Sequence, residues 1–204
     1  MSLKLAELER GVTFWLSGTK WPRDFHNDFY RRMADDNSRG VFNDAWWAKF
    51  LPELRKWRTT RPRGSAFLTS RTQAGFSDLA QAWDLTVEPN LGQDIASLEW
   101  SRVSAFPALV SEIKDVASPV FTSKFCHFLA PAIFPVADNA AMGNPFSTYE
   151  ACFRTFKAEW LSTDEVTRQA LVSWLTNLID APLVAGYPTK NKIVELCLIG
   201  RNQG

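Results

Sequence analysis

Apolar side chains recur at three- and four-residue steps along almost the whole chain, and this spacing constrains the fold most strongly. The clearest run shares one helical face and consists of Trp46, Trp47, Phe50, Leu51, Leu54 and Trp57. Such spacing is typical of an amphipathic α-helix, whereas a half-buried strand would alternate with period two. No convincing run of period-two alternation occurs. We therefore expect an all-α fold, a single-domain helical bundle.

Local signals divide the first half of the chain into expected elements. After an opening amphipathic helix, a second helix is marked by the apolar residues within 25–33, and a third should follow Asn43. The stretch 64–75 is polar and rich in Gly, Ser and Thr, so we expect a loop there. Residues 76–85 and 101–113 are expected to be helical again.

The second half of the chain is punctuated more clearly. Ser118-Pro119 is typical of a helix start, and residues 147–150 and 162–165 each fit the Ser-x-x-Glu capping box. A helix is expected to follow each of these signals. A last helix should begin near Thr189 and stop at Gly200, since glycine commonly follows the end of a helix.

Length and composition are those of one ordinary domain covering residues 1–204. A chain of 204 residues can bury roughly 70% of its unfolded surface, and 9 Trp and 15 Phe should make the core strongly aromatic. No apolar run approaches the roughly 20 residues that cross a bilayer, and the first residues lack the apolar stretch of a signal peptide. We expect a cytoplasmic monomer without membrane contact.

Cysteine and histidine are few and scattered. Cys126, Cys152 and Cys197 lie far apart with no CxxC pair, and only His26 and His127 could join them in a metal site. Neither a disulfide framework nor a zinc site is expected. No metal and no organic cofactor is implied.

Positive charge is concentrated towards the N-terminus. Residues 1–75 carry 14 Lys and Arg against 8 Asp and Glu, whereas residues 76–204 carry 9 against 14. The densest cluster contains five cations, the candidate DNA-binding residues Arg55, Lys56, Arg58, Arg61 and Arg63. Arginine forks suit phosphates, and the indole of Trp57 could stack on a base or sugar. Alternatively, these cations only complement the dipole at a helix C-terminus.

The segment from 118 to 139 contains the candidate catalytic residues Lys124 and Asp138. Lys124 borders an apolar helical arc, so partial burial should lower the pKa of its amine and favour a neutral nucleophile. Asp138 precedes a short helix-compatible stretch, and a position as N-cap would keep its carboxylate ionised. A proline-limited loop joins the two, so both side chains can reach one site. The alternative is a snorkelling lysine and a purely structural cap.

One pattern within this segment combines a helix entered through Thr122-Ser123-Lys124, an apolar run and the stretch Phe134-Pro-Val-Ala-Asp138. It resembles the core of the helix-hairpin-helix DNA glycosylases, most closely the 8-oxoguanine type. The resemblance implies that Lys124 attacks the sugar C1′ and that Asp138 supports the oxocarbenium-like transition state. Most of the chain more loosely resembles small bacterial proteins of this fold, some of them similar to phage-defence glycosylases, including the Brig type.

Two features depart from the family pattern. Where the family has a Gly-x-Gly turn, this chain reads Asp115-Val-Ala-Ser-Pro119, and the interval from Lys124 to Asp138 is shorter than in the eukaryotic enzymes. The helix start at Ser118 still leaves free N–H groups that can hold a phosphate. Ser118 is therefore a further candidate DNA contact.

The resemblance implies a glycosylase that binds double-stranded DNA containing a modified base, flips that base out and cuts its N-glycosidic bond. His127 and Lys192 are the candidate base-pocket residues, with Lys190 and Glu195 as further polar candidates. A lone histidine on a packed helix is more commonly structural. The excised base stays open between an oxidised purine and a hypermodified phage pyrimidine such as glucosylated hydroxymethylcytosine. The product also stays open between strand cleavage and a plain abasic site. Two alternative functions are a non-catalytic DNA-binding module and a protein-interaction module that uses exposed Trp and Phe.

Overall fold

The computed structural model describes residues 2–18, 30, 32, 39–60, 64–114, 118–143, 146–179 and 187–204. Within these ranges all regular structure is helical, which confirms the expected all-α class. The elements in chain order are α1 (Leu5–Gly18), α3 (Asp44–Lys56), α4 (Gly64–Ala74), α5 (Phe76–Ala82), the π-helix η1 (Trp83–Val87), the 3-10 helix η2 (Glu88–Asn90), α6 (Trp100–Val103), α7 (Ala105–Ile113), α8 (Pro119–Leu129), α9 (Asn139–Met142), α10 (Tyr149–Ser162), α11 (Glu165–Ile179) and α12 (Thr189–Asn202). The helix expected around residues 25–33 lies largely outside the described residues, as do His26, Arg61 and Arg63.

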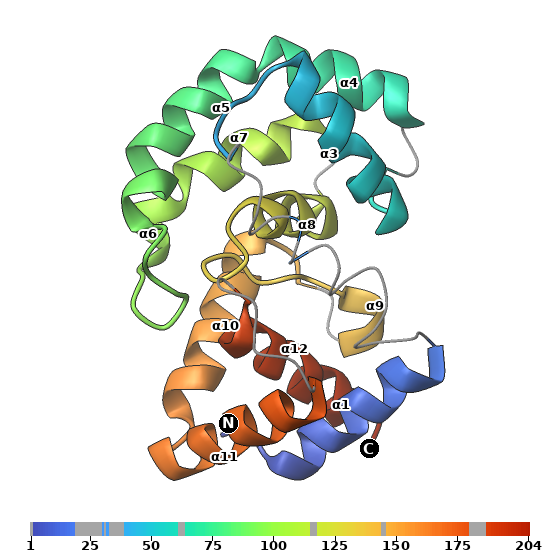
Figure 1. Ribbon diagram of the computed structural model, residues 1–204, viewed down its shortest axis with the longest axis vertical. Helices are drawn as coiled ribbons and strands as arrows, with labels where there is room; N and C mark the ends of the chain where they lie inside the picture. Colours follow the sequence, from blue (N-terminus) through green and yellow to red (C-terminus); the bar gives the residue numbers. More distant parts are fainter. Residues whose placement is uncertain are drawn as a thin grey trace.

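Helix α8 lies in the middle of the molecule, between two groups of helices (Figure 1). Helices α3 to α7 arch over one side of it, and α1, α10, α11 and α12 lie on the other. Helix α8 packs against α7 in the first group and against α10 in the second. A side chain on α8 can therefore contact both halves of the protein.

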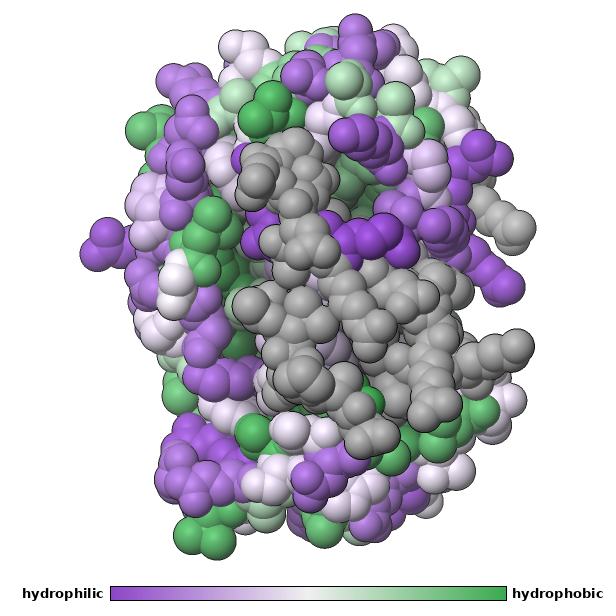
Figure 2. Space-filling model, viewed as in Figure 1, coloured by the Kyte–Doolittle hydropathy of each residue, from purple (hydrophilic) through white to green (hydrophobic). Residues whose placement is uncertain are grey.

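The core is strongly aromatic, as its composition predicted. Trp46 stacks on Phe50 with ring centroids 4.7 Å apart, and Phe50 meets Phe125 of α8 at 5.0 Å. Buried apolar side chains from both helix groups belong to one continuous cluster. Among the described residues no Trp or Phe is in the exposed class, and on the face in Figure 2 hydrophobic side chains appear in small patches between hydrophilic ones. An interaction surface of exposed Trp and Phe is therefore not found in the described part of the chain.

The expected loop at 64–75 is wrong, because α4 occupies that stretch. Leu68 and Thr72 are buried one turn apart, and the Thr72 hydroxyl donates to the carbonyl of Leu68 at 2.8 Å. Helix α3 also contributes, since Trp47 Nε1 donates to the hydroxyl of Thr69 at 2.8 Å. Packing against α3 thus overrides the weak helix propensity of a Gly/Ser/Thr-rich sequence.

The helix starts in the second half are close to those predicted, but two caps differ. Ser118 caps α8 as expected and accepts from the backbone N–H of Phe121 at 3.3 Å. Thr148, rather than Ser147, caps α10. Asp164, rather than Ser162, accepts from the first turn of α11. Runs of Ser, Thr and Asp offer several capping side chains in succession, so the pattern alone does not choose among them.

The predicted end of the last helix at Gly200 is also wrong, because α12 continues to Asn202. Gly200 and Gly11 instead lie where α12 crosses α1. A Cβ on Gly200 would collide with the carbonyl oxygen of Glu7, and a Cβ on Gly11 would collide with that of Leu196. The glycines therefore permit close packing of the two helices.

Within the described ranges, no helix is long and apolar enough to cross a membrane. Cys126, Cys152 and Cys197 are buried free thiols. No group of three or more His, Cys, Asp and Glu side chains in the described part of the chain could hold a metal ion.

Candidate functional site

Lys124 lies on α8 where the two helix groups meet. Its Nζ donates a hydrogen bond of 3.2 Å to the carbonyl oxygen of Trp57, at the end of α3, and lies 5.7 Å from the centroid of the Trp57 ring. The side chain is partly buried, as its place on the apolar arc predicted. Among the described residues, no carboxylate lies within ion-pair distance of this ammonium group.

A buried hydrogen bond joins the residues that directly precede the two candidate catalytic residues in the chain. The backbone N–H of Ala137 donates to the hydroxyl of Ser123 at 2.9 Å, in the buried interior. Lys124 and Asp138 directly follow these two partners in the chain. The stretch after α8 is thereby held against α8, and the lysine and the aspartate interact electrostatically.

Asp138 is the N-cap of α9, as predicted. Its Oδ1 accepts from the backbone N–H of Ala141 at 3.4 Å, and its side chain is partly buried. A side-chain oxygen at this position satisfies a backbone N–H that has no partner within the helix. The fold thus places a negative charge beside Lys124 without joining the two in an ion pair.

Burial lowers the pKa of Lys124 below the usual value of a lysine. The negative charges of Asp138 and Glu195 oppose this effect, while the positive charges of Lys192 and Arg58 add to it. The direction agrees with the sequence-based expectation. A larger fraction of neutral amine is the result, and only the neutral amine is a nucleophile.

Lys192 and Glu195 form a buried ion pair beside Lys124. Their Nζ and Oε2 atoms are 2.6 Å apart, and the side chains are 5% and 4% exposed. Burial raises the pKa of Glu195, with opposition from Lys192 and reinforcement from Asp138. Lys192 was predicted to line a base pocket, but its charge is directed to Glu195. Lys190, a further polar candidate on α12, contacts Asp94 and the ring of Trp160 instead.

His127 is held inside the protein at both ring nitrogens. Nδ1 is 2.6 Å from the carbonyl oxygen of Phe134, and Nε2 is 2.5 Å from the hydroxyl of Tyr30. A carbonyl only accepts, so Nδ1 carries the proton and Nε2 accepts from Tyr30. Burial lowers the pKa of His127 to about 3, which keeps the ring neutral. His127 therefore anchors the chain beyond α8, and the structural alternative fits it better than a place in a base pocket.

The predicted basic cluster lies at the C-terminal end of α3. Arg55, Lys56 and Arg58 are exposed there, and Lys56 pairs with Glu53 at 2.9 Å. Neither Arg55 nor Arg58 forms an ion pair within the described residues, so both guanidinium groups can take a phosphate. Arg61 and Arg63 belong to the part of the cluster outside the described residues.

Two features of this helix end were not predicted. Arg58 has a φ of 57°, in the left-handed region that usually takes glycine after a helix. Trp57 is only 7% exposed and packs on Phe128 with centroids 4.8 Å apart. Its expected stacking on a base is therefore wrong, because the ring is part of the core.

Lys114 is a further residue that sequence reasoning missed. Its Nζ donates to the carbonyl oxygen of Thr59 at 3.0 Å, and burial lowers its pKa. Lys114 and Lys124 thus both bind carbonyls just beyond α3, a favourable place for cations. The contacts join positions 55 and 67 residues apart in the chain, and no local pattern marks such pairs.

The partly desolvated amine of Lys124 interacts electrostatically with the carboxylate of Asp138 and with the buried ion pair of Lys192 and Glu195. Chemically, such a set suits an amine nucleophile beside a group that stabilises developing positive charge. Ser118, partly buried at the start of α8, and the exposed arginines of α3 suit phosphate groups. Comparison of the chain with protein-family models, with curated proteins and with solved structures finds no match.

Proposed function

We propose that the protein is a DNA glycosylase that removes a modified base, with Lys124 and Asp138 as its catalytic residues. The observation that carries this proposal is the partly buried amine of Lys124. Its pKa is lowered, and it interacts electrostatically with the carboxylate of Asp138, which caps α9. A structural cation would normally be paired, whereas a nucleophile must lose its proton. The resemblance of the segment 118–139 to helix-hairpin-helix glycosylases supports the same assignment.

In the proposed reaction, the neutral amine of Lys124 attacks C1′ of a flipped nucleotide. The C1′–N bond breaks, its electron pair leaves with the base, and the base takes up a proton. The carboxylate of Asp138 stabilises the positive charge that develops on the sugar. Opening of the sugar ring gives a Schiff base, which water hydrolyses or which leads to strand cleavage. If Lys124 instead only positions a water molecule, the product is a plain abasic site.

The DNA would be held mainly through its phosphates. Arg55, Arg58 and the helix start at Ser118 are the proposed contacts within the described residues, with Arg61 and Arg63 continuing the cluster. The substrate is double-stranded DNA with an oxidised purine or a hypermodified phage pyrimidine, and removal of the latter would serve anti-phage defence. The protein would act as a cytoplasmic monomer without a cofactor.

A second candidate function is a non-catalytic DNA-binding module. The observation in its favour is that Lys114 and Lys124 are bound alike, each to a carbonyl oxygen just beyond α3. On that interpretation both lysines only stabilise the end of α3. The exposed arginines would then bind DNA without any reaction.

Borohydride trapping on modified DNA tests the first function, with genomic DNA from phages of known base modification and a duplex containing 8-oxoguanine as substrates. Mass spectrometry of the released bases identifies the substrate. A covalent adduct should form with the wild type and with Lys114→Gln, the matched control, and should be absent with Lys124→Gln. Base release that continues undiminished in Lys124→Gln would remove Lys124 from the mechanism. Salt-dependent DNA binding without release of any base would favour the second function.

A further inference from the structure

A cavity of about 530 Å³ lies against α10, α11 and α12, apart from the Lys124 site. Its walls include Trp160, Arg168, Val172, Ser173 and Lys190. Cavities of this size hold small organic molecules, and this one combines apolar and polar walls. None of its lining residues belongs to the candidate catalytic site.

Two cations of the cavity lie against one indole ring. The guanidinium carbon of Arg168 is 5.8 Å from the centroid of the Trp160 ring, and Nζ of Lys190 is 5.7 Å from it. Both positive groups also line the cavity, and the ring that they contact is itself only 4% exposed. Both cations are partly shielded from solvent, with side chains that are 23% and 36% exposed.

Each cation is matched by a carboxylate that is not buried. Arg168 pairs with Glu165 at 2.7 Å, and the Glu165 side chain is 64% exposed against 23% for Arg168. Lys190 pairs with Asp94, whose side chain is one-third exposed. Exposed ion pairs contribute little stability, so a ligand oxyanion can replace these carboxylates at small cost.

Only one side of the Arg168 guanidinium group has a hydrogen-bond partner among the described residues. Glu165 binds an Nη atom, while the Nε–H is buried without a hydrogen-bond partner. The Nε–H has almost no accessible surface, so the Nη groups are the part of Arg168 that a ligand in the cavity can bind. An oxyanion in the cavity would replace Glu165 on the Nη side of the guanidinium group.

We propose that this cavity binds an organic phosphate monoester. A phosphate monoester carries nearly two negative charges and presents three oxygens in different directions, which suits two cations on different helices better than a planar carboxylate does. The cavity is much larger than a phosphate group, so an organic body extends along Val172 and Ala96. Ser173 and Gln169 offer hydrogen bonds to hydroxyl groups of that body.

The proposed ligand site is separate from the catalytic chemistry, although both use α12. Lys190 faces the cavity, whereas Lys192 is directed to Glu195 beside Lys124. Residues two apart on a helix point to different faces. The proposal therefore does not depend on the glycosylase assignment, and either can fail without the other.

Isothermal titration calorimetry with ribose 5-phosphate and AMP as probes tests the proposal, with ribose and adenosine as unphosphorylated controls. At least one phosphorylated probe should bind with a Kd below about 1 mM, the range of a weak specific ligand, and its control should not bind. The double variant Arg168→Gln/Lys190→Gln should weaken binding at least about tenfold, as expected for two charge-assisted contacts. Arg154→Gln, which breaks an exposed ion pair elsewhere on α10, should leave binding unchanged.

A second variant keeps the test decisive if the double variant folds poorly. Glu165→Gln removes the carboxylate that competes for Arg168, so it should tighten phosphate binding several-fold. Absence of binding by both phosphorylated probes would overturn the proposal. Unchanged affinity in the double variant would also overturn it. Equally tight binding of inorganic phosphate would do the same, because the organic part of the ligand would then contribute nothing to binding.

Discussion

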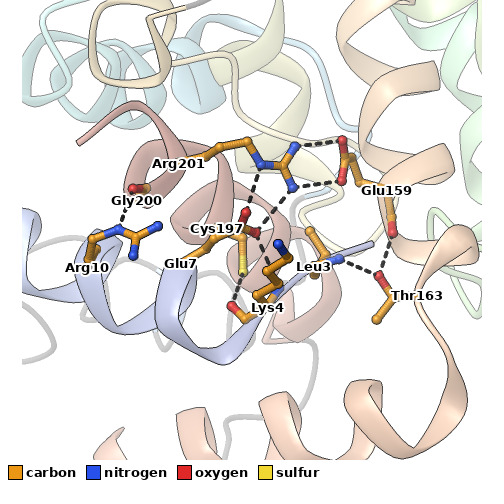
Figure 3. Close-up of polar contacts among 9 residues, drawn as sticks. All are labelled: Leu3, Lys4, Glu7, Arg10, Glu159, Thr163, Cys197, Gly200 and Arg201. Carbon is orange, nitrogen blue, oxygen red and sulfur yellow. Dashed lines mark hydrogen bonds and ion pairs between the residues drawn. The ribbon is translucent and has the colours of Figure 1, made fainter. Parts of the chain in front are cut away.

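Two partly buried cations of this protein, Arg201 and Lys124, have opposite surroundings. Arg201, on α12, is bound by two carboxylates: its Nη1 is 2.9 Å from Oε1 of Glu159, and its Nε is 3.1 Å from Oε1 of Glu7 (Figure 3). Hydrogen bonds to Glu159 and Glu7 raise the pKa of Arg201 above its usual range. Among the described residues, the Lys124 ammonium group donates a hydrogen bond to one carbonyl oxygen and has no carboxylate partner, and burial lowers its pKa.

The surroundings of Arg201 are those of a structural joint. Its carboxylate partners lie on α1 and α10, so one guanidinium group ties three helices together. The same joint includes the hydroxyl of Thr163, which accepts from the backbone N–H of Leu3 at 2.9 Å and donates to the carbonyl of Glu159 at 2.8 Å (Figure 3). Every group in it has a partner, which is what stability requires of buried charges.

Stability and the proposed chemistry thus depend on different regions of this molecule. Full pairing fixes the charge on Arg201 and leaves nothing for a substrate to change. At Lys124, the nearby charges of Asp138 and Glu195 act on the amine without neutralising it. Groups with perturbed pKa values and incomplete pairing are candidates for function rather than for stability.

The largest expected effect is on reaction rate. Lys124→Gln should reduce base excision about a thousandfold or more, because the substituted amide is no nucleophile. Arg201→Gln should leave the rate of the folded fraction within a few-fold of wild type, since its partners lie away from Lys124. Single-turnover assays on modified DNA measure both rates. Comparable losses of rate in the two variants would show that Lys124 has no special part in the reaction.

The next largest effect is on stability, where Arg201 should matter more than Lys124. Arg201→Met should lower the free energy of unfolding by about 2–4 kcal/mol, because Glu7 and Glu159 are left buried without their cation. Lys124→Met should change it by no more than about 1 kcal/mol, since it removes a desolvated charge as well as a hydrogen bond. Urea unfolding followed by circular dichroism gives both values. A larger loss in Lys124→Met than in Arg201→Met would make Lys124 the structural cation.

A smaller effect should appear in the pH dependence of stability. Because the pKa of Lys124 is lower in the folded than in the unfolded chain, the unfolded state binds more protons between the two values. The stability of the wild type relative to Lys124→Met should therefore rise with pH in that window and level off above about 10.5, the unfolded value. The stability of the wild type relative to Arg201→Met should show no such rise, because the arginine stays charged over the whole pH range. Urea unfolding at a series of pH values checks both, and a flat Lys124 difference would show that its pKa is not lowered.

The sequence was sufficient for the parts of the site that depend on local patterns. The 3.6-residue spacing of Phe121, Phe125 and Phe128 predicted the buried face of α8, and therefore the partial burial of Lys124. The position of Asp138 before a short helical stretch predicted its role as a cap. Both depend on neighbours within a few positions, which is the range over which helix periodicity and capping act.

Contacts between distant segments could not be predicted in the same way. The carbonyl partner of Lys124 is 67 residues away, and the partner of His127 at Tyr30 is 97 residues away. Gly200 shows the same limit, since its sequence context indicates a helix end while its function depends on α1. Such pairings are decided by the packing of whole helices, which leaves no signal at a fixed spacing.

The smallest predicted effect concerns Arg58. At this residue the free energy of unfolding and the affinity for DNA should change in opposite directions. Its φ of 57° strains a residue with a side chain, so Arg58→Gly should raise the free energy of unfolding by about 0.5–1 kcal/mol. The same change should weaken DNA binding several-fold and reduce its salt dependence, because one phosphate contact is lost. Urea unfolding and DNA titration at two salt concentrations measure the pair. Arg55→Gln is the control, because it removes a neighbouring positive charge without changing the backbone. If Arg58→Gly stabilises the fold but binds DNA as well as wild type, the strained arginine has no part in DNA binding and its conformation has some other cause.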